Sequence, residues 1–119
     1  MITFIICSLE PAKASAVEKN VRETVGVPCE LVIEDNRIKK NGICSVYNHC
    51  ARKARGEYLC FLHEDVVFHG NGWGQSVIAQ LQKKETGIIG FMGSIYKSKA
   101  PSGWNVLPRL NRCHFIQTD

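Results

Sequence analysis

Apolar runs alternate with helix-like segments along residues 1–93, and this alternation constrains the fold more than any other feature of the chain. The runs at residues 2–7, 31–33 and 58–62 contain almost no polar side chain, which is typical of strands buried on both faces. Residues 86–91 predict a fourth strand, in which closely spaced glycines would let neighbouring backbones approach. Four strands are therefore expected.

Between these runs, apolar residues recur every three or four positions, the spacing of an amphipathic helix. The first helix is expected to begin at Pro11 and to stop at Gly26, and the second to run from Ile43 to a stop at Gly56. A third follows Gly72, with Trp73 on its buried face. The order β-α-β-α-β-α-β predicts an α/β fold: a three-layer α/β/α arrangement with a mostly parallel, Rossmann-like sheet.

The chain of 119 residues suits one domain, expected over residues 1–119. Its core would be residues 1–93, followed by an irregular tail at residues 94–119 with a short strand at residues 113–117. The tail is where a second half of the domain would be truncated.

Polar residues follow three of the predicted strands, at residues 8–10, 34–36 and 63–65. Right-handed crossovers place the carboxyl ends of parallel strands at one edge of the sheet, so these clusters should converge there. Glu64 and Asp65 directly follow an apolar strand, where a desolvated carboxylate is costly without a cation or hydrogen-bond donors. This edge is therefore the expected ligand site.

Charge and cysteine usage limit the classes of partner. The net charge of +4 suits an anionic small ligand such as a nucleotide diphosphate, and it is too weak to predict nucleic-acid binding. The six cysteines lack any C-x-x-C pair, which indicates free thiols in a reducing compartment, and a cytoplasmic location is expected. The apolar start has no basic leader, and no segment reaches the ~20 apolar residues of a membrane span.

The pattern resembles the family 2 glycosyltransferases, which have the GT-A fold. Similar features are the first strand with Ser8, the second strand with Asp35, Asn48 in the following helix, and residues 54–65. The last segment, Ala-Arg-Gly-Glu-Tyr running into Phe-Leu-His-Glu-Asp, resembles the family turn and a His-Glu-Asp variant of its D-x-D motif. The resemblance covers about residues 1–93 and implies a nucleotide-sugar-binding half of such an enzyme.

The resemblance implies a role for each matched position. Asp65 would coordinate a divalent cation, Mn²⁺ or Mg²⁺, that bridges the diphosphate of a sugar nucleotide and neutralises the leaving group. His63 would be a further metal ligand or a hydrogen-bonded turn residue, and Glu64 is expected to point away from the site. The nucleotide would be bound by Ser8, Leu9, Glu10, Asp35 and Asn48. The alternatives are a turn role for Asp35 and, for Asn48, a structural role that ties neighbouring strand ends together.

Two departures from the family concern phosphate binding and catalysis. Tyr47 stands where a basic residue often helps to hold the diphosphate, and Lys39 or Lys40 would have to substitute for it. The general base normally lies in the second half of the domain, but Asp119 is the one acid after residue 85, so the catalytic residues are unknown. Trp104, in the tail, would either stack on a sugar or have no ligand role.

Three functions remain open from the sequence. The first is a glycosyltransferase, or its donor-binding half, that transfers sugar to an unknown glycan or lipid-linked acceptor. The second is a non-catalytic module of the same fold that binds a nucleotide or a protein, and the third is a metal-dependent hydrolase using His63, Asp65 and His69. No nucleic-acid partner is expected, whereas an open sheet edge would allow a homodimer.

Overall fold

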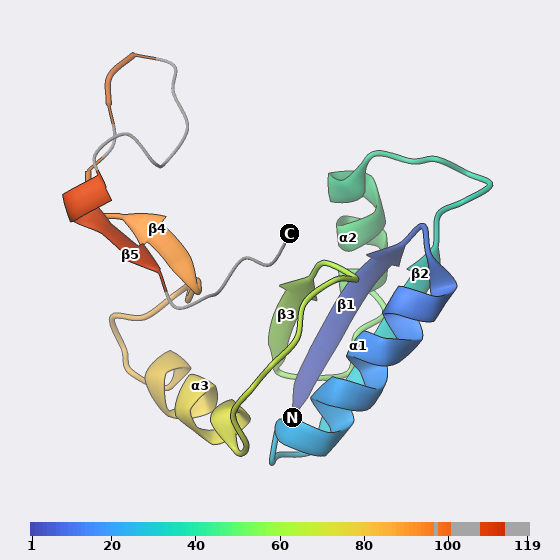
Figure 1. Ribbon diagram of the computed structural model, residues 1–119. Coiled ribbons are helices and arrows are strands. Elements are labelled where there is room, and N and C mark those ends of the chain that lie inside the picture. Colours follow the sequence, from blue (N-terminus) through green and yellow to red (C-terminus); the bar gives the residue numbers. More distant parts are fainter. Residues whose placement is uncertain (97, 101–107, 114–119) are drawn as a thin grey trace.

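The computed structural model describes residues 1–96, 98–100 and 108–113 (Figure 1). Within these ranges the chain forms three α-helices, five strands and one short 3₁₀ helix. In chain order they are β1 (Ile2–Ser8), α1 (Pro11–Thr24), β2 (Cys29–Asp35), α2 (Ile43–Ala51), β3 (Tyr58–Leu62), α3 (Trp73–Leu81), β4 (Met92–Ser94), η1 (Pro108–Leu110) and β5 (Asn111–Cys113).

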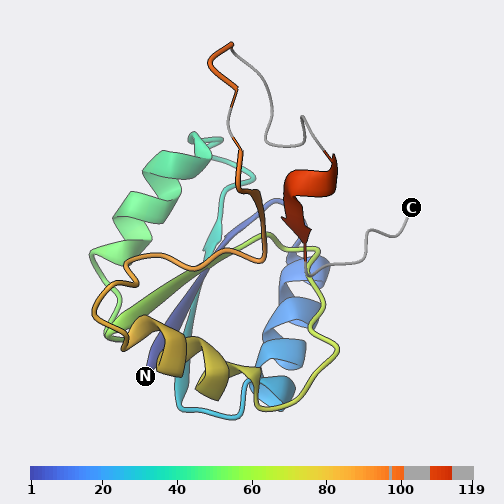
Figure 2. The same cartoon turned by 90° about the vertical axis from the view of Figure 1, so that its left-hand side faces the viewer.

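A parallel three-stranded sheet in the order β2-β1-β3 forms the centre of the molecule, which confirms the α/β, Rossmann-like prediction. β1 lies between the other two strands, and this explains its mostly apolar sequence, since both of its faces are covered. α1 and α3 pack on one face around Phe4, and α2 packs on the other around Ile5 (Figures 1 and 2). The first face includes an edge-on contact between Phe4 and Trp73, whose ring centroids are 5.7 Å apart.

The helices begin and end largely where the sequence predicts. α1 starts at Pro11, and the chain turns at Gly26, which has a φ of 70° that suits glycine after a helix. α2 starts at Ile43 as expected but ends at Ala51, so Gly56 does not stop it. Among the described residues, no helix combines the length and the apolarity that crossing a membrane requires.

The strand expected at residues 86–91 does not form. β4 lies just beyond it and pairs antiparallel with β5 in a separate two-stranded sheet. Ile88 is 92% exposed, so this segment does not extend the central sheet. The two isoleucines lie between Gly87 and Gly90, and glycine weakens a strand because it contributes no side chain to packing. The tail strand expected at residues 113–117 begins earlier, at Asn111, and residues 114–117 lie outside the described ranges.

β3 is an edge strand of the described sheet, and the prediction that it is buried on both faces is wrong. Leu59 and Phe61 are 42% and 48% exposed on the face that carries α2. α2 packs over β1 and β2, and its only described hydrogen bond to β3 runs from the Tyr47 hydroxyl to the Leu62 carbonyl, at 3.0 Å. The outer part of β3 is therefore only partly covered.

Gly56 packs directly against the amino end of β1. A Cβ built on Gly56 would lie 2.7 Å from the Thr3 nitrogen and 2.9 Å from the Met1 carbonyl oxygen. The Gly56 N–H donates to Thr3 Oγ1, and the Thr3 hydroxyl donates to Glu30 on β2. The Arg55 N–H and Nε also donate to Glu30, at 2.9 and 2.7 Å. This network ties the α2–β3 loop to the sheet.

Stability should fall at acidic pH, in part through Glu30. Hydrogen bonds from the Arg55 backbone and side chain and from Thr3 lower the pKa of Glu30 from 4.5 to about 2. A carboxyl whose pKa is lower in the folded state stabilises the fold above pH 4.5, and this contribution is lost as the pH falls toward 2. We expect the melting temperature to drop over this interval and the drop to be smaller in Glu30→Gln.

Thermal unfolding followed by circular dichroism from pH 6 to about pH 2 measures this effect. Glu23→Gln is the matched control, because Glu23 is an exposed acid on α1, 3.9 Å from Lys19. The assignment to Glu30 is wrong if Glu30→Gln and Glu23→Gln show the same pH dependence as the unmodified chain.

Candidate functional site

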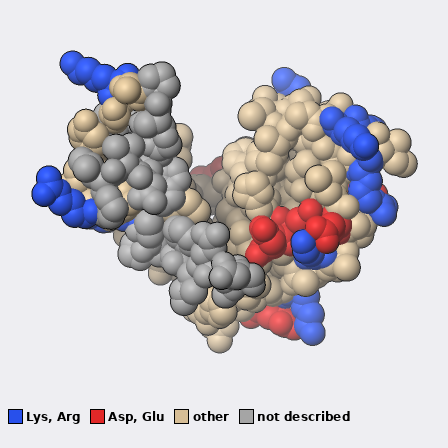
Figure 3. Space-filling view, turned by 45° about the horizontal axis from the view of Figure 1, so that its top comes forward, with Lys and Arg blue, Asp and Glu red and all other residues tan. Residues whose placement is uncertain are grey.

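An open cavity of about 390 Å³ lies at the carboxyl edge of the central sheet. The loops after β1, β2 and β3 all contribute to it, which confirms that these polar clusters converge. Figure 3 shows acidic side chains gathered on the molecular surface around a basic one. The lining residues are Cys7, Leu9, Glu10, Lys13, Asn36, Asn41, Ile43, His63, Glu64 and Asp65.

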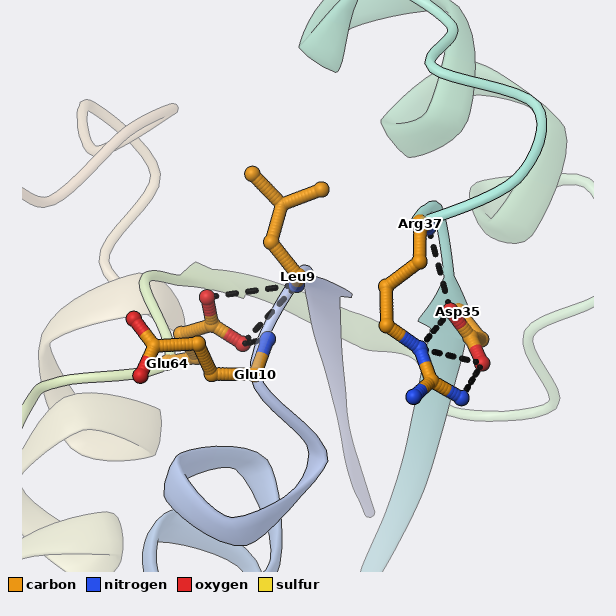
Figure 4. Close-up of polar contacts among 5 residues, drawn as sticks. All are labelled: Leu9, Glu10, Asp35, Arg37 and Glu64. Atoms are coloured by element: carbon orange, nitrogen blue, oxygen red, sulfur yellow. Dashed lines mark hydrogen bonds and ion pairs between the residues drawn. The ribbon is translucent and has the colours of Figure 1, made fainter.

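Glu64 turns toward the loop after β1, so the expectation that it points away is wrong. Its carboxylate accepts hydrogen bonds from the Leu9 N–H at 3.0 and 3.2 Å and from the Glu10 N–H at 3.0 Å (Figure 4). Partial burial raises the pKa of Glu64, but the Glu10 N–H, the Ser8 hydroxyl, the Leu9 N–H and Lys13 together outweigh it, and the net pKa is lowered. The Ser8 hydroxyl lies close enough to lower the pKa of Glu64, but its geometry does not meet the criteria of a hydrogen bond. Glu64 is therefore a charged acceptor that joins two loops.

Asp65 and His63 also line the cavity, and both side chains are exposed. They flank Glu64 in sequence, and the hydrogen bonds of Glu64 to the β1–α1 loop hold this segment beside that loop. Both positions were predicted from the sequence as metal ligands, and their oxygen and nitrogen atoms remain available at the edge of the sheet.

Asp35 is engaged with Arg37 rather than with the cavity (Figure 4). The guanidinium Nη2 lies 2.6 Å from Asp35 Oδ2, and the Arg37 N–H also donates to the carboxylate, at 3.0 Å. These side-chain and backbone hydrogen bonds lower the pKa of Asp35 to about 2. Asp35 is thus an ion-paired carboxylate at the end of β2.

Asn36 lines the cavity next to Asp35, as expected for the polar cluster at residues 34–36, although the sequence analysis gave it no role of its own. Its side chain is buried and forms two hydrogen bonds with the Asn41 backbone, at 2.8 and 2.9 Å. Its N–H donates to the Ser8 carbonyl at 2.8 Å. Asn36 therefore links the β2–α2 loop to the end of β1. The available signal was its position directly after a strand of the parallel sheet.

Lys13 lines the cavity and was missed by the sequence analysis. It lies in the first turn of α1, and its Nζ is 2.6 Å from Glu10 Oε1. The hydrogen bond and charge of Glu10 raise the pKa of Lys13, with smaller contributions from Glu64 and Asp65. Lys13 therefore brings a positive charge to the cavity, whereas Lys39 and Lys40 do not line it.

The remaining predicted residues lie at different distances from the cavity. Leu9 and Glu10 line it, while Ser8 is buried beneath the loop. Asn48 is exposed on α2 and is absent from the lining. Lys39 contacts Glu34 at 3.3 Å and lines a smaller neighbouring cavity of about 160 Å³. Trp104 and Asp119 lie outside the described residues.

The side chains at the cavity suit a cation only in part. In the described portion of the chain, no group of three or more His, Cys, Asp or Glu side chains could hold a metal ion. The hydrolase with His63, Asp65 and His69 as a ligand set is therefore not supported, and His69 does not line the cavity. Hard divalent cations are often bound by one or two carboxylates together with substrate phosphates, which this donor set allows.

Fold and cavity together define an α/β protein with a polar cavity at the carboxyl edge of a parallel sheet, the edge at which open α/β sheets bind their ligands. The family follows from comparison with family models. The model of a glycosyltransferase-like family matches residues 3–113, and the chain belongs to this family. Comparisons with curated proteins and with solved structures gave no significant match. Family membership suggests a transferase and implies a sugar donor.

Proposed function

We propose that this chain is a glycosyltransferase, or the donor-binding half of one, and that it binds a nucleotide-diphosphate sugar at the carboxyl edge of its sheet. The main supporting observation is the cavity of about 390 Å³ lined from the loops after β1, β2 and β3. Its volume lies within the roughly 300–1,000 Å³ typical of small-ligand sites. The acceptor is a glycan or lipid-linked hydroxyl of unknown identity.

The proposal assigns the diphosphate to the part of the cavity that contains Asp65, His63 and Lys13. Asp65, the last residue of a D-x-D-like element, would hold Mn²⁺ or Mg²⁺ together with His63, and the diphosphate oxygens would complete the coordination. When bound, such a cation neutralises the negative charge of the departing nucleotide. Lys13 would add a second positive charge, in place of the basic residue that Tyr47 replaces.

The nucleotide would lie on the loop after β1, over Leu9 and Glu10. Asn36 would lie beside the nucleotide, because its N–H donates to the Ser8 carbonyl at the end of β1. Asp35 could reach the ribose or base only by exchanging its ion pair with Arg37, whereas Asn48 would have to act from outside the lining.

The alternative is a non-catalytic module of the same fold that binds a nucleotide or a protein partner. It is favoured by the acid content of the chain, because no Asp or Glu lies between residues 86 and 118 to act as general base. Binding of donor without transfer or hydrolysis would select this alternative.

We also propose a cellular location and an oligomeric state. The five cysteines whose side chains the structure describes carry free thiols, which fits a cytoplasmic location. The partly exposed edge strand β3 offers a surface for a homodimer. Light scattering at several concentrations measures the oligomeric state.

Isothermal titration calorimetry of the full chain with UDP-sugars and GDP-sugars tests the proposed function. Each titration is performed with Mn²⁺ and again after chelation. We expect saturable binding of one nucleotide class that weakens without the cation. Absence of binding under every condition would reject a donor site.

A further inference from the structure

We propose that Glu64 is a positioning residue that locks the loop after β1 against the end of β3, so that the cavity is preformed before a ligand arrives. This inference rests on the proposed function, because the ligand that benefits is the nucleotide sugar. Glu64 stands at the middle position of the D-x-D-like element, but its carboxylate faces backbone N–H groups of its own chain.

The hydrogen bonds of Glu64 join two loops of the chain. Glu64 accepts three contacts of 3.0–3.2 Å from two successive N–H groups, those of Leu9 and Glu10. Two successive N–H groups converging on one carboxylate fix both the distance and the orientation between the loops. Hydrogen bonds to a charged acceptor are stronger than those between neutral groups.

The Glu64 lock holds two sides of the cavity in place. Leu9 and Glu10 line one side of the cavity, and His63 and Asp65, the sequence neighbours of Glu64, line another. β1 and β3 pair as far as Ile6 and Leu62, and the loops on the two sides of the cavity begin beyond this ladder. Past the end of the ladder, the Glu64 hydrogen bonds link the two loops directly.

The lock also determines which polar groups of the β1–α1 loop remain free for a ligand. Because Glu64 already occupies the Leu9 and Glu10 N–H groups, a nucleotide is expected to contact this loop through side chains and carbonyl oxygens. The Glu10 side chain is paired with Lys13, which leaves the Lys13 ammonium close to the locked loop. Supporting residues that orient binding groups in this way typically change affinity or activity by about 10–100-fold when they are removed.

Glu64→Gln in the full chain tests the lock with two independent measurements. Glutamine preserves the size of the side chain, and its carbonyl oxygen can replace Oε2, which accepts both 3.0 Å bonds. It loses the charge that strengthens these bonds, and it loses the 3.2 Å contact of Oε1. We expect hydrogen exchange of the Leu9 and Glu10 amides, followed by NMR, to accelerate at least about tenfold, with no change at the β1 amides. We also expect the Kd for UDP or GDP with Mn²⁺ to rise about 10–100-fold.

Glu57→Gln is the matched control, since Glu57 is an exposed acid just before the amino end of the same strand. It should change neither the two amides nor the Kd. Unchanged amide exchange in Glu64→Gln, or a Kd equal to or below that of the unmodified chain, would overturn the lock. A lower Kd would instead indicate that Glu64 blocks the site.

The outcomes also separate this inference from the proposed function. If the unmodified chain binds neither nucleotide, the proposed function fails, and the amide measurement alone decides whether Glu64 holds the loop. If Glu64→Gln fails to fold, exchange in the unmodified chain still decides, because unprotected Leu9 and Glu10 amides would contradict the lock.

Discussion

Replacing Asp65 by alanine is expected to weaken binding of UDP or GDP in the presence of Mn²⁺ by about 100-fold or more. Removal of a group that supports a metal ligand already costs about 10–100-fold, and loss of a proposed ligand itself should cost at least as much. Asp65 is exposed in the loop after β3, so its removal should leave the melting temperature almost unchanged. Calorimetry and thermal unfolding measure the two effects separately.

Two further variants make this result specific. Asp65→Asn preserves the size of the side chain and removes its charge, and it should weaken binding nearly as much as alanine. Glu85→Ala removes an exposed acid that does not line the cavity, and it should leave the Kd unchanged. Equal affinity of Asp65→Ala and the unmodified chain would remove Asp65 from the proposed metal site.

Gly56→Ala is expected to destabilise the fold by about 3 kcal/mol, lowering the melting temperature by roughly 10 °C. The new Cβ would lie 2.6 Å from Thr3 Oγ1 and 2.7 Å from the Thr3 nitrogen, closer than Cβ atoms are normally found. Thr3 cannot retreat, because β1 is hydrogen-bonded to a strand on each side. Chemical denaturation and thermal unfolding both measure the loss.

Gly87→Ala is the control for this substitution, because a Cβ at Gly87 would meet nothing within 4 Å and its φ is not positive. Its stability should stay within about 0.5 kcal/mol of the unmodified chain. A stable Gly56→Ala variant would show that the α2–β3 loop can move away from β1.

Much of the fold could be predicted because local patterns and tertiary packing agree. The apolar runs and the helical spacing identified β1, α1, α2, β3 and α3, and the convergence of three polar loops followed from parallel topology alone. The strand predicted at residues 86–91 does not form, because an apolar run between glycines does not by itself specify a strand with which to pair. The prediction that β3 is buried on both faces was wrong, because the apolar pattern cannot reveal that the neighbouring helix leaves one face partly uncovered.

The candidate site divides in a similar way. Position after a strand correctly brought Leu9, Glu10, His63 and Asp65 to the cavity. It could not indicate that Asp35, the last residue of β2, pairs with Arg37 in the loop that follows, because this depends on how far the Arg37 side chain reaches. Lys13 was missed because the packing of α1 decides which residues of its first turn face the cavity, and the sequence does not show this packing.

The sequence alone determined the order of the strands and helices, because the spacing of apolar residues differs between the two. It also determined the edge of the sheet at which a ligand would bind, because parallel strands all end at the same edge. The choice among neighbouring polar residues was made only by the tertiary structure. Glu64 and Asp65 are adjacent acids with the same local signals, yet one binds the backbone of a distant loop and the other remains exposed in the cavity. That difference arises because the N–H groups of Leu9 and Glu10 reach Glu64 only once β1 and β3 are paired.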